Sequence, residues 1–317
     1  MTYYARIAGT GSYLPEKRLT NFDLEKMVDT TDAWIVERTG IHARHLAEGH
    51  ETNAFIATAA AKRAIEAAGM DPKDIELIIV GTSTPDKLLP STACLVQEQL
   101  GNNGHPAFDL MAACAGFNYG LSIADQYIRS GAVKNAVVIG SEIMSRILDW
   151  NDRTTCVLFG DGAGAVVLER SKEPGILSTH IRAAGQYKDI LYTPSGLIKN
   201  EKVAVHMQGK ELFRQAVEKL GEIVQETLAA NHLPPEKIDW FVPHQANIRI
   251  IQAMAKKLNM TMDKVVLTVG EHGNTSAASI PLALDQAVRD GRIQRGQTLL
   301  LESFGGGLAW GSALIKY

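Results

Sequence analysis

The feature that most constrains the fold is an internal duplication, because a chain that repeats its own pattern is expected to fold into two similar units. Residues 67–80 align with residues 230–243, an offset of 163 (230 − 67), and residues 125–131 align with 285–291, an offset of 160 (285 − 125). In each half an apolar strand, a glycine turn and another apolar run come next. The order helix–strand–helix–strand–helix–strand–turn–strand therefore occurs twice.

This order predicts an α/β protein of two pseudo-symmetric halves, at residues 1–172 and 173–317. Strands that alternate with helices favour parallel pairing, in sheets that helices cover on both faces. A length of 317 residues, with 45% hydrophobic and 21% charged residues, is sufficient for the core that such a fold needs.

The expected elements follow from apolar periodicity and from capping residues. Asn21 and Thr31 are predicted to cap helices over residues 22–28 and 32–38. Further helices are expected at 58–69, at 92–100 and after residue 114, and strands at 5–9, 75–80, 108–111, 136–140, 240–242, 265–269 and 298–302. The glycine cluster at 160–164 is predicted to be a turn between two strands within 156–169, because no helix follows its third glycine, as a dinucleotide site requires. The stretch 191–202 is expected to be a loop.

Charge and cysteine content exclude several classes of protein. The formal net charge of −3 gives no overall attraction to nucleic acid or to an anionic membrane. Three scattered cysteines are too few for a disulfide framework or a zinc site. The first residues lack the apolar region of a signal peptide, and no run reaches the ~18–20 apolar residues of a membrane span. We therefore expect a cytoplasmic protein without a metal.

Cys114 is the first candidate catalytic residue. It follows a short apolar strand and a turn of small residues, and a long helix opens near it. A thiol at a helix N-terminus faces unpaired N–H groups and the positive end of the macrodipole, which lower its pKa and make it a nucleophile. The alternative is a buried core cysteine, which is the role we expect for Cys94 and Cys156.

Two further polar residues are expected at the same edge. Ligands of α/β sheets bind beyond the carboxyl ends of the strands. The local offset of 160 takes Cys114 to Asn274 (114 + 160), again between a strand and a helix, and His244 follows the strand at 240–242. If a two-fold relates the halves, Cys114, His244 and Asn274 converge.

These three side chains suit two reaction classes. In a cysteine hydrolase, His244 is the base for Cys114 and Asn274 orients the imidazole ring. In a condensing enzyme, Cys114 carries an acyl thioester, while the other two donate hydrogen bonds to the thioester carbonyl of a second substrate. Decarboxylation of that substrate leaves an enolate, whose charge these donors stabilise.

Several segments together resemble the β-ketoacyl-acyl-carrier-protein synthase III family of the thiolase-like superfamily. The resemblance extends over essentially the whole chain, and four motifs occur in the family's order: Asp-Leu-Met-Ala-Ala-Cys114-Ala-Gly-Phe, Pro243-His244-Gln-Ala-Asn-Ile-Arg249, Glu-His-Gly-Asn274-Thr-Ser-Ala-Ala-Ser and Ser303-Phe-Gly-Gly-Gly307. It implies a duplicated thiolase-like fold, two pseudo-symmetric halves in an αβαβα layered arrangement. It also implies a homodimer.

The resemblance further implies a ping-pong reaction. Cys114 takes an acyl group, with acetyl most expected, from acyl-CoA. His244 and Asn274 then promote decarboxylation of malonyl-acyl-carrier protein, and the enolate attacks the acyl-cysteine to give a 3-ketoacyl-acyl-carrier protein, which initiates fatty-acid synthesis. Backbone N–H groups of Cys114 and Gly306 form the oxyanion hole. Coenzyme A enters as a substrate thioester, so no cofactor is expected.

The family's contact residues also transfer to this chain. Coenzyme A is expected along a tunnel lined by Trp34, Arg38, Arg153, Gly209, Phe213, Asn247 and Ile250, with its adenine between Trp34 and Arg153. Carrier-protein contacts are expected at Gln245, Ala246, Asn247, Ile248, Arg249, Lys256, Lys257 and Arg214.

Three alternatives stay open. Arg249, Lys256 and Lys257 share one face of a predicted helix, which is either the docking surface or an ordinary solvated face. Leu89 replaces an aromatic residue that some acetyl-preferring relatives carry in the acyl pocket, so a longer or branched primer is an alternative to acetyl. Biosynthetic thiolase is disfavoured, because it needs a second cysteine near the C-terminal glycine turn and this chain has none after Cys156.

Overall fold

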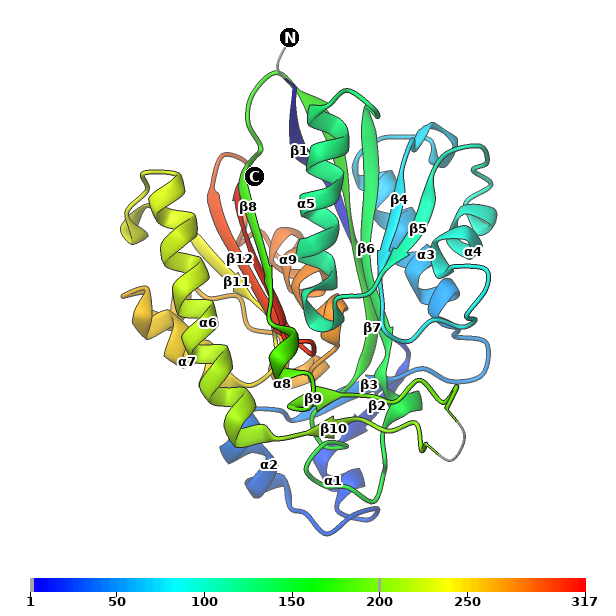
Figure 1. The fold of residues 1–317 in the computed structure, drawn as a ribbon, viewed down its shortest axis with the longest axis vertical. Helices are drawn as coiled ribbons and strands as arrows, with labels where there is room; N and C mark the ends of the chain where they lie inside the picture. Colours follow the sequence, from blue (N-terminus) through cyan, green and yellow to red (C-terminus); the bar gives the residue numbers. More distant parts are fainter. Residues whose placement is uncertain (1–2, 199–200) are drawn as a thin grey trace.

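The computed structural model describes residues 3–198 and 201–317 and contains two main sheets (Figure 1). The first sheet has the strand order β1-β7-β6-β4-β5, and the second has the order β11-β12-β13-β8. Two small antiparallel pairs, β2–β3 and β9–β10, lie outside these sheets.

The strands of the first sheet are β1 (Tyr4–Tyr13), β4 (Ile78–Gly81), β5 (Ala107–Leu110), β6 (Asn135–Ile143) and β7 (Asp161–Ser171). Those of the second are β8 (Ile176–Ala183), β11 (Trp240–Pro243), β12 (Thr298–Gly305) and β13 (Ala309–Lys316). The small pairs comprise β2 (Lys17–Thr20), β3 (Ala43–Leu46), β9 (Leu191–Tyr192) and β10 (His206–Met207). The helices are α1 (Asn21–Leu24), α2 (Asp32–Thr39), α3 (Asn53–Ala67), α4 (Thr92–Gln99), α5 (Gly116–Arg129), α6 (Gly209–Ala230), α7 (Ile248–Lys257), α8 (Val269–His272) and α9 (Ser279–Arg289).

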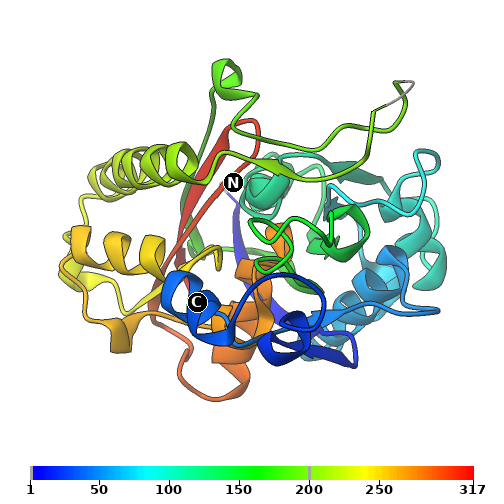
Figure 2. The same cartoon turned by 90° about the horizontal axis from the view of Figure 1, so that it is seen from below.

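The elements form the five layers that the resemblance implied. Helices α3 and α4 cover the outer face of the first sheet, and α6 and α7 cover the outer face of the second. Helices α5 and α9 contact strands of both sheets and make up the middle layer (Figure 1). The view from below shows these two helices between the outer helical layers (Figure 2). The predicted α/β fold with duplicated halves is therefore confirmed.

Strand periodicity explains why the layers share their strands. Side chains alternate between the faces of a sheet. On β6, Val137 and Ile139 pack into the core under α3, whereas Ala136 and Val138 pack into the core around the middle helices. A strand that is covered by helices on both sides must therefore be apolar on both faces. For this reason the sequences of these strands are nearly continuous apolar runs.

The strand pairing is similar in the two halves, and it shows that the predicted parallel pairing holds for only some of the strands. Strand β4 pairs in parallel with β5 and β6, and β11 pairs in parallel with β12, whereas β6–β7, β7–β1, β12–β13 and β13–β8 are antiparallel. In the two main sheets, parallel pairing is thus confined to strands that helices separate in the chain, whereas β12 and β13 follow one another through a short turn and pair antiparallel. The predicted boundary between residues 172 and 173 lies in the connection from β7 to β8 and stays a prediction.

Three expected strands or turns were wrong. Residues 156–158 form turns rather than a strand, and Phe159 forms a single bridge with Asn274. The glycine cluster at 160–164 leads into and lies within the single strand β7. The expected strand at 265–269 is reduced to one bridge between Phe241 and Val265, followed by α8. Most of the described part of 191–202 is irregular, as expected, but it begins with β9; residues 199–200 lie outside the described residues.

Helix starts depend on caps, and one cap was assigned to the wrong residue. Thr31 caps α2 as predicted, its side chain accepting from the Trp34 N–H. The cap of α1 is Thr20 rather than Asn21, because Thr20 and Asp23 form a reciprocal capping box. The helix expected from residue 58 begins five residues earlier, where Thr52 caps α3. No helix among the described residues is both long and apolar enough to cross a bilayer.

Candidate active site

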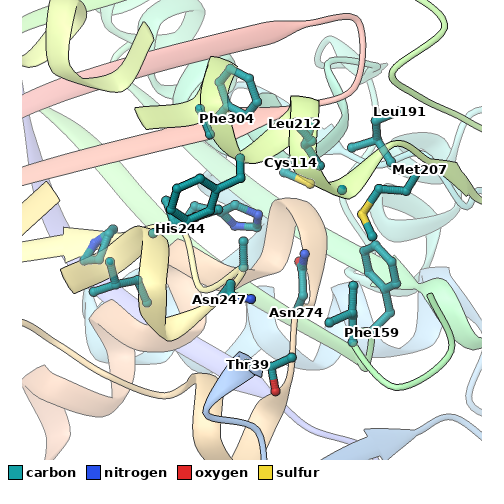
Figure 3. Close-up of a pocket in the computed structure, with 18 of the residues that line it drawn as sticks. Thr39, Cys114, Phe159, Leu191, Met207, Leu212, His244, Asn247, Asn274 and Phe304 are labelled. Carbon is teal, nitrogen blue, oxygen red and sulfur yellow. The ribbon is translucent and has the colours of Figure 1, made fainter. Parts of the chain in front are cut away.

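One cavity of about 210 Å³ brings Cys114, His244 and Asn274 together. Figure 3 shows the three side chains around a common space, with Phe304 above them and Phe159 to one side. The remaining lining includes apolar residues of α6 and α7, such as Leu212, Ala216, Leu220 and Ile251. The expected convergence of residues from both halves is therefore what the structure contains.

Cys114 lies slightly before the position that the sequence suggested. It belongs to a 3-10 helix, Ala113–Ala115, and α5 begins only at Gly116. The thiol is 7% exposed, and burial raises its pKa to about 12, although a hydrogen bond with Ser276 opposes the rise. The expected lowering toward neutrality is thus not what the resting site provides: a proton acceptor is needed when the thiol reacts.

The two 3-10 helices that precede α5 and α9 reveal the true equivalence of the halves. Ala113 and Ser276 both have positive φ, 45° and 50°, and they are 163 positions apart (276 − 113). The helices end 160 positions apart, at Arg129 and Arg289 (289 − 129), because α9 is three residues shorter than α5 (14 against 11 residues). Cys114 is therefore equivalent to Ala277 (114 + 163) and not to Asn274, which reaches the cavity from the preceding loop.

His244 is held at the end of β11. Its backbone N–H donates to the carbonyl of Glu302 on β12, at 2.8 Å. The side chain is buried, and desolvation lowers its pKa to about 4, so the imidazole is neutral at physiological pH. Among the described residues, its Nδ1 has no hydrogen-bond partner. A neutral ring of this kind can donate to a carbonyl or accept a proton.

Asn274 is fixed by the other half of the molecule. Its N–H donates to the carbonyl of Leu158 at 2.8 Å, and its carbonyl accepts from the Gly160 N–H at 3.1 Å. Its side-chain Oδ1 accepts from the Ser276 N–H at 2.9 Å. Because the amide oxygen is occupied, the amide nitrogen is the group left to donate a hydrogen bond into the cavity.

The glycine turn after β12 lies against the nucleophile. A Cβ at Gly305 would be 2.6 Å from the Cys114 nitrogen and 3.0 Å from its Cβ, so only glycine fits at position 305. Gly306, whose N–H is the expected second oxyanion donor, follows directly and packs against the carbonyl of Leu191. Its oxyanion role stays a prediction.

The expected coenzyme A residues divide into two groups. Arg38, Gly209, Phe213, Asn247 and Ile250 line the cavity. Trp34 and Arg153 lie outside the lining, and the Arg153 guanidinium is 5.5 Å from the centroid of the Trp34 ring. Arg38 also lies over that ring, at 4.7 Å. This spacing leaves no room for an adenine between Trp34 and Arg153, so the expected sandwich requires Arg153 to leave its contacts with Asp29.

The expected docking helix is α7, and its residues differ in availability. Arg249 is half exposed and donates to the Glu37 carbonyl on α2, whereas the Lys257 ammonium donates to the Val217 carbonyl on α6. Lys256 is exposed, and Arg214 forms an exposed ion pair with Glu211.

Gln245 is a correction to the expected carrier-protein contacts. It is 1% exposed, and its amide joins the end of β11 to the start of α8, donating to Pro243 and Val266 and accepting from Thr268 and Val269. The side chain cannot reach a docked protein. Ala246 lines the cavity, Asn247 caps α7, and Ile248 packs against Gly40.

Sequence reasoning missed a carboxyl group in the cavity. Glu302 lines it, is 1% exposed and has an Oε2 without a partner among the described residues. Burial raises its pKa to about 8, so it is mostly protonated at neutral pH. A single glutamate within the apolar run Leu-Leu-Leu-Glu302 was the signal available. Leu89 is 86% exposed and does not line this cavity.

A buried cysteine facing two neutral groups able to donate hydrogen bonds, in a duplicated five-layer α/β fold, defines a thiolase-like enzyme of acyl transfer. The comparisons with known proteins narrow this class. Residues 108–185 match the family model "3-Oxoacyl-[acyl-carrier-protein (ACP)] synthase III", and residues 228–317 match the model of its C-terminal part.

Relatives resemble the chain over its full length. It is 61% identical over 321 residues to a β-ketoacyl-[acyl-carrier-protein] synthase III of Alkalilimnicola ehrlichii, covering 99% of each chain, and 58% identical to that of Methylococcus capsulatus, covering all of both. The crystal structure of the Aquifex aeolicus 3-oxoacyl-[acyl-carrier-protein] synthase III superposes with a TM-score of 0.95 at 49% identity, covering 99% of this chain and 100% of that one. The chain belongs to the β-ketoacyl-acyl-carrier-protein synthase III family. It is an acyltransferase and a condensing enzyme of fatty-acid synthesis.

Proposed function

We propose that this protein condenses a short acyl-CoA, acetyl-CoA first, with malonyl-acyl-carrier protein, through an acyl group carried on Cys114. The observation that carries the proposal is the shared cavity: one thiol faces His244 and the Asn274 amide nitrogen, and both are neutral. Neutral donors suit a thioester carbonyl that becomes an enolate, because they stabilise the developing charge without titrating.

In the first half-reaction the Cys114 thiol loses its proton as its sulfur attacks the acyl-CoA carbonyl, and coenzyme A leaves and takes up a proton to become the free thiol. In the second, the malonyl thioester enters with its carbonyl against His244 and Asn274. The bond to its carboxylate breaks, CO2 leaves, and the electron pair becomes the enolate. The enolate then attacks the acyl-cysteine, releases the sulfur and forms the 3-ketoacyl product.

The size of the cavity supports a ping-pong order. About 210 Å³ is below the roughly 300–1,000 Å³ of a typical small-molecule site, so the cavity suits one thioester arm at a time. Coenzyme A would enter past Arg38, Phe213 and Asn247, and Arg153 would swing from Asp29 to cover the adenine on Trp34. The carrier protein would then dock at the same mouth, on Arg249 and Lys256.

A homodimer formed along β5 is part of the proposal. Strand β5 is an edge strand of its sheet, with polar backbone groups available for pairing. Next to it are three exposed apolar side chains, Leu88, Leu89 and Met111, at 70%, 86% and 76% exposure. A second copy pairing with β5 would cover all three and would bring its Leu89 toward the acyl-binding region of the first copy.

One assay tests the activity. The protein is incubated with labelled acetyl-CoA and malonyl-acyl-carrier protein, and label on Cys114, CO2 release and 3-ketoacyl product are followed together. We expect label on the wild-type protein and none on Cys114→Ser. Free acid without need for the malonyl substrate would instead identify a hydrolase. A branched or longer acyl-CoA that labels Cys114 faster than acetyl-CoA would identify the alternative primer.

A further inference from the structure

A second buried carboxyl, that of Glu142 near the end of β6, has no part in the mechanism above. Its Oε1 accepts from the Ser276 hydroxyl at 3.0 Å, and its Oε2 accepts from the hydroxyls of Thr84 and Thr82 at 2.6 and 3.3 Å. The Ser83 N–H donates to both oxygens, at 3.1 and 3.0 Å. The carboxyl group is thus anchored on the β4–α4 loop of the first half, and it holds a residue of the second half.

Ser276 connects this carboxyl group to the catalytic Asn274. The Ser276 N–H donates to Asn274 Oδ1 at 2.9 Å, while the Ser276 hydroxyl donates to Glu142 at 3.0 Å. The two hydrogen bonds use different groups of one residue, so both form at the same time. Glu142 and Asn274 are therefore joined through a single residue by two direct hydrogen bonds.

The Ser276 N–H determines which way the Asn274 amide faces. A backbone N–H can only donate, so the atom opposite it must be the amide oxygen. Turning the amide over would bring its NH2 group against this N–H and leave two donors facing each other. As long as the N–H stays in place, the amide nitrogen is the group that Asn274 presents to the cavity with Cys114 and His244.

The backbone of Ser276 needs contacts that hold it. Its φ is +50°, which a non-glycine residue rarely adopts and which persists only where neighbouring groups fix it. Its counterpart in the first half, Ala113, has a φ of 45° and packs against the turn at Gly305, where an added Cβ would be 3.2 Å from the Ala113 Cβ. The repeated backbone conformation therefore does not require a hydroxyl. The hydroxyl is found in the half that contains Asn274, and there it binds Glu142.

We propose that Glu142 is a positioning residue for malonyl decarboxylation: it holds Ser276, whose N–H fixes the Asn274 amide with its nitrogen toward the substrate. This role rests on the proposed function and adds to it the group that keeps one of the two donors in its active orientation. Glu142 acts through Ser276 and does not touch the substrate. It serves the second half-reaction, because acylation of Cys114 does not use the Asn274 amide.

The test separates the two half-reactions in Glu142→Gln and in Ser276→Ala. Labelled acetyl-CoA measures acylation of Cys114. Labelled CO2 from malonyl-acyl-carrier protein measures decarboxylation, in protein that has been acylated beforehand so that a slower first step does not enter. Ser276→Ala removes the hydroxyl and keeps the N–H, and Ala113 shows that this fold accommodates alanine at such a φ. This variant keeps the test valid if Glu142→Gln does not fold.

We expect both variants to decarboxylate about tenfold more slowly than wild type, because the amide is then free to turn away from the substrate. In Glu142→Gln, acylation should be unchanged or faster, since the charge of Glu142 raises the pKa of the Cys114 thiol and its removal does not hinder ionisation. An equal loss of both steps in Glu142→Gln would show a residue needed only for folding and would overturn the proposal. Ser279→Ala, which removes another buried hydroxyl from the same segment, is the control and should match wild type.

A double-mutant cycle shows whether Glu142 acts through Asn274. If it does, Glu142→Gln slows CO2 release in the wild-type background and causes no further loss in Asn274→Ala, which has no amide to orient. In His244→Ala the further loss of about tenfold should remain, which shows that it can still be measured in a slow enzyme.

The outcomes distinguish this positioning role from the proposed function. The role is overturned if Glu142→Gln slows CO2 release equally in the wild-type and Asn274→Ala backgrounds, or if it leaves CO2 release unchanged. Unchanged CO2 release in Ser276→Ala decides in the same way if Glu142→Gln does not fold. In all these cases a wild type that is acylated and condenses leaves the proposed function in place. A wild type that releases no CO2 from malonyl-acyl-carrier protein overturns the proposed function, and the positioning role with it.

Discussion

Asn274 shows how neighbouring residues prepare one side chain for one role. Two backbone hydrogen bonds to the other half fix its position, and a third bond, from Ser276, uses its side-chain oxygen. His244 is prepared differently: burial keeps its ring neutral. Both side chains therefore present neutral donors to a substrate, and neither needs a change of protonation state to do so.

We expect His244→Ala and Asn274→Ala to keep acylation of Cys114 and to lose malonyl decarboxylation by about 100-fold or more, the usual effect of removing one donor to a developing oxyanion. Labelled acetyl-CoA measures the first step, and CO2 release measures the second. His272→Ala is a matched control, because His272 is equally buried, with a pKa lowered to about 4, but does not line the cavity. Loss of acylation alone in the two variants would contradict their assigned roles.

Glu302 predicts a pH dependence of stability. Its pKa is raised by burial from 4.5 to about 8, so the folded protein binds a proton that the unfolded chain releases between these values. This contribution is fully present below pH 4.5 and is lost as the pH rises through about 8. Between pH 5.5 and 8, the free energy of unfolding of wild type should fall by about 3 kcal/mol more than that of Glu302→Gln.

Urea unfolding at the two pH values measures this difference. Glu236→Gln, at an exposed position, is the control and should follow wild type. A wild type and a Glu302→Gln variant that lose equal free energy over this range would show that Glu302 is already ionised at pH 5.5.

The residues that sequence reasoning found and missed differ in a simple way. Cys114 and His244 follow predicted strands, at the edge where α/β proteins bind ligands, so their positions singled them out. Asn274 was reached through a repeat offset that the structure does not support for this segment. Glu142 and Glu302 lie inside strands that are mostly apolar, and a strand pattern does not say which face meets a cavity. Only the packing of β6 against the 3-10 helix at Ser276, and of β12 against α6, gives these carboxyls their surroundings.

At the scale of elements, α7 joins the cavity to the surface. Ile251 and Met254 bury its inner side, while Arg249 and Lys256 face outward. The two basic residues remain candidates for binding an acidic carrier protein. Lys257 is a weaker candidate than the sequence suggested, because its ammonium already caps a carbonyl of α6.

We expect Arg249→Glu to raise the KM for the carrier-protein substrate about tenfold and to leave the acetyl-CoA half-reaction unchanged. The control is Glu37→Ala, which removes the 3.9 Å ion pair of Arg249 but keeps the backbone carbonyl that it binds. Steady-state kinetics with varied malonyl-acyl-carrier protein measure the effect. A damaged acetyl-CoA half-reaction would show that Arg249 serves the contact between α2 and α7 instead.

Helices and strands were predicted correctly where a local sequence signal specifies them. The predictions were wrong where contacts with residues distant in the chain determine the local structure. The cap at Thr31 was readable from the sequence, and so were most central strands. Residues 265–269 have strand-like composition, but only Val265 reaches β11, and the chain then turns into α8 to hold Asn274. The cap at Thr20 was missed because Asn21, also a good capping residue, follows it and instead binds Arg44 and Asp32 inside the protein.

At the scale of the whole molecule, the exposed edge at β5 leads to a prediction about assembly. Met111→Lys should convert the proposed dimer to a monomer, because a two-fold interface at β5 would set the two introduced charges close together. Sedimentation velocity measures the change. Phe22→Lys, a substitution of an exposed apolar residue on α1, is the control. A Met111→Lys protein with the sedimentation coefficient of wild type would place the interface elsewhere.

The division into two similar α/β halves was predictable from the sequence because it depends on the repeat, and a repeated pattern persists even where individual residues differ. The five-layer arrangement was implied by the family resemblance. The alignment offset of the active-site segment could not be predicted from the sequence. Helix α9 is three residues shorter than α5, so the offset between the two halves is 163 before these helices and 160 after them. An alignment anchored on the helix ends therefore paired Cys114 with Asn274, although the 3-10 helices pair it with Ala277.

The middle layer has a consequence for how the molecule can be divided. Helices α5 and α9 each bury apolar side chains against both sheets. Either half expressed by itself would therefore expose a large apolar surface to water. Two separately produced fragments would aggregate or unfold when kept apart, yet mixing them should reconstitute the enzyme. Such complementation is the behaviour expected of an ancient gene fusion whose parts have since lost their independence.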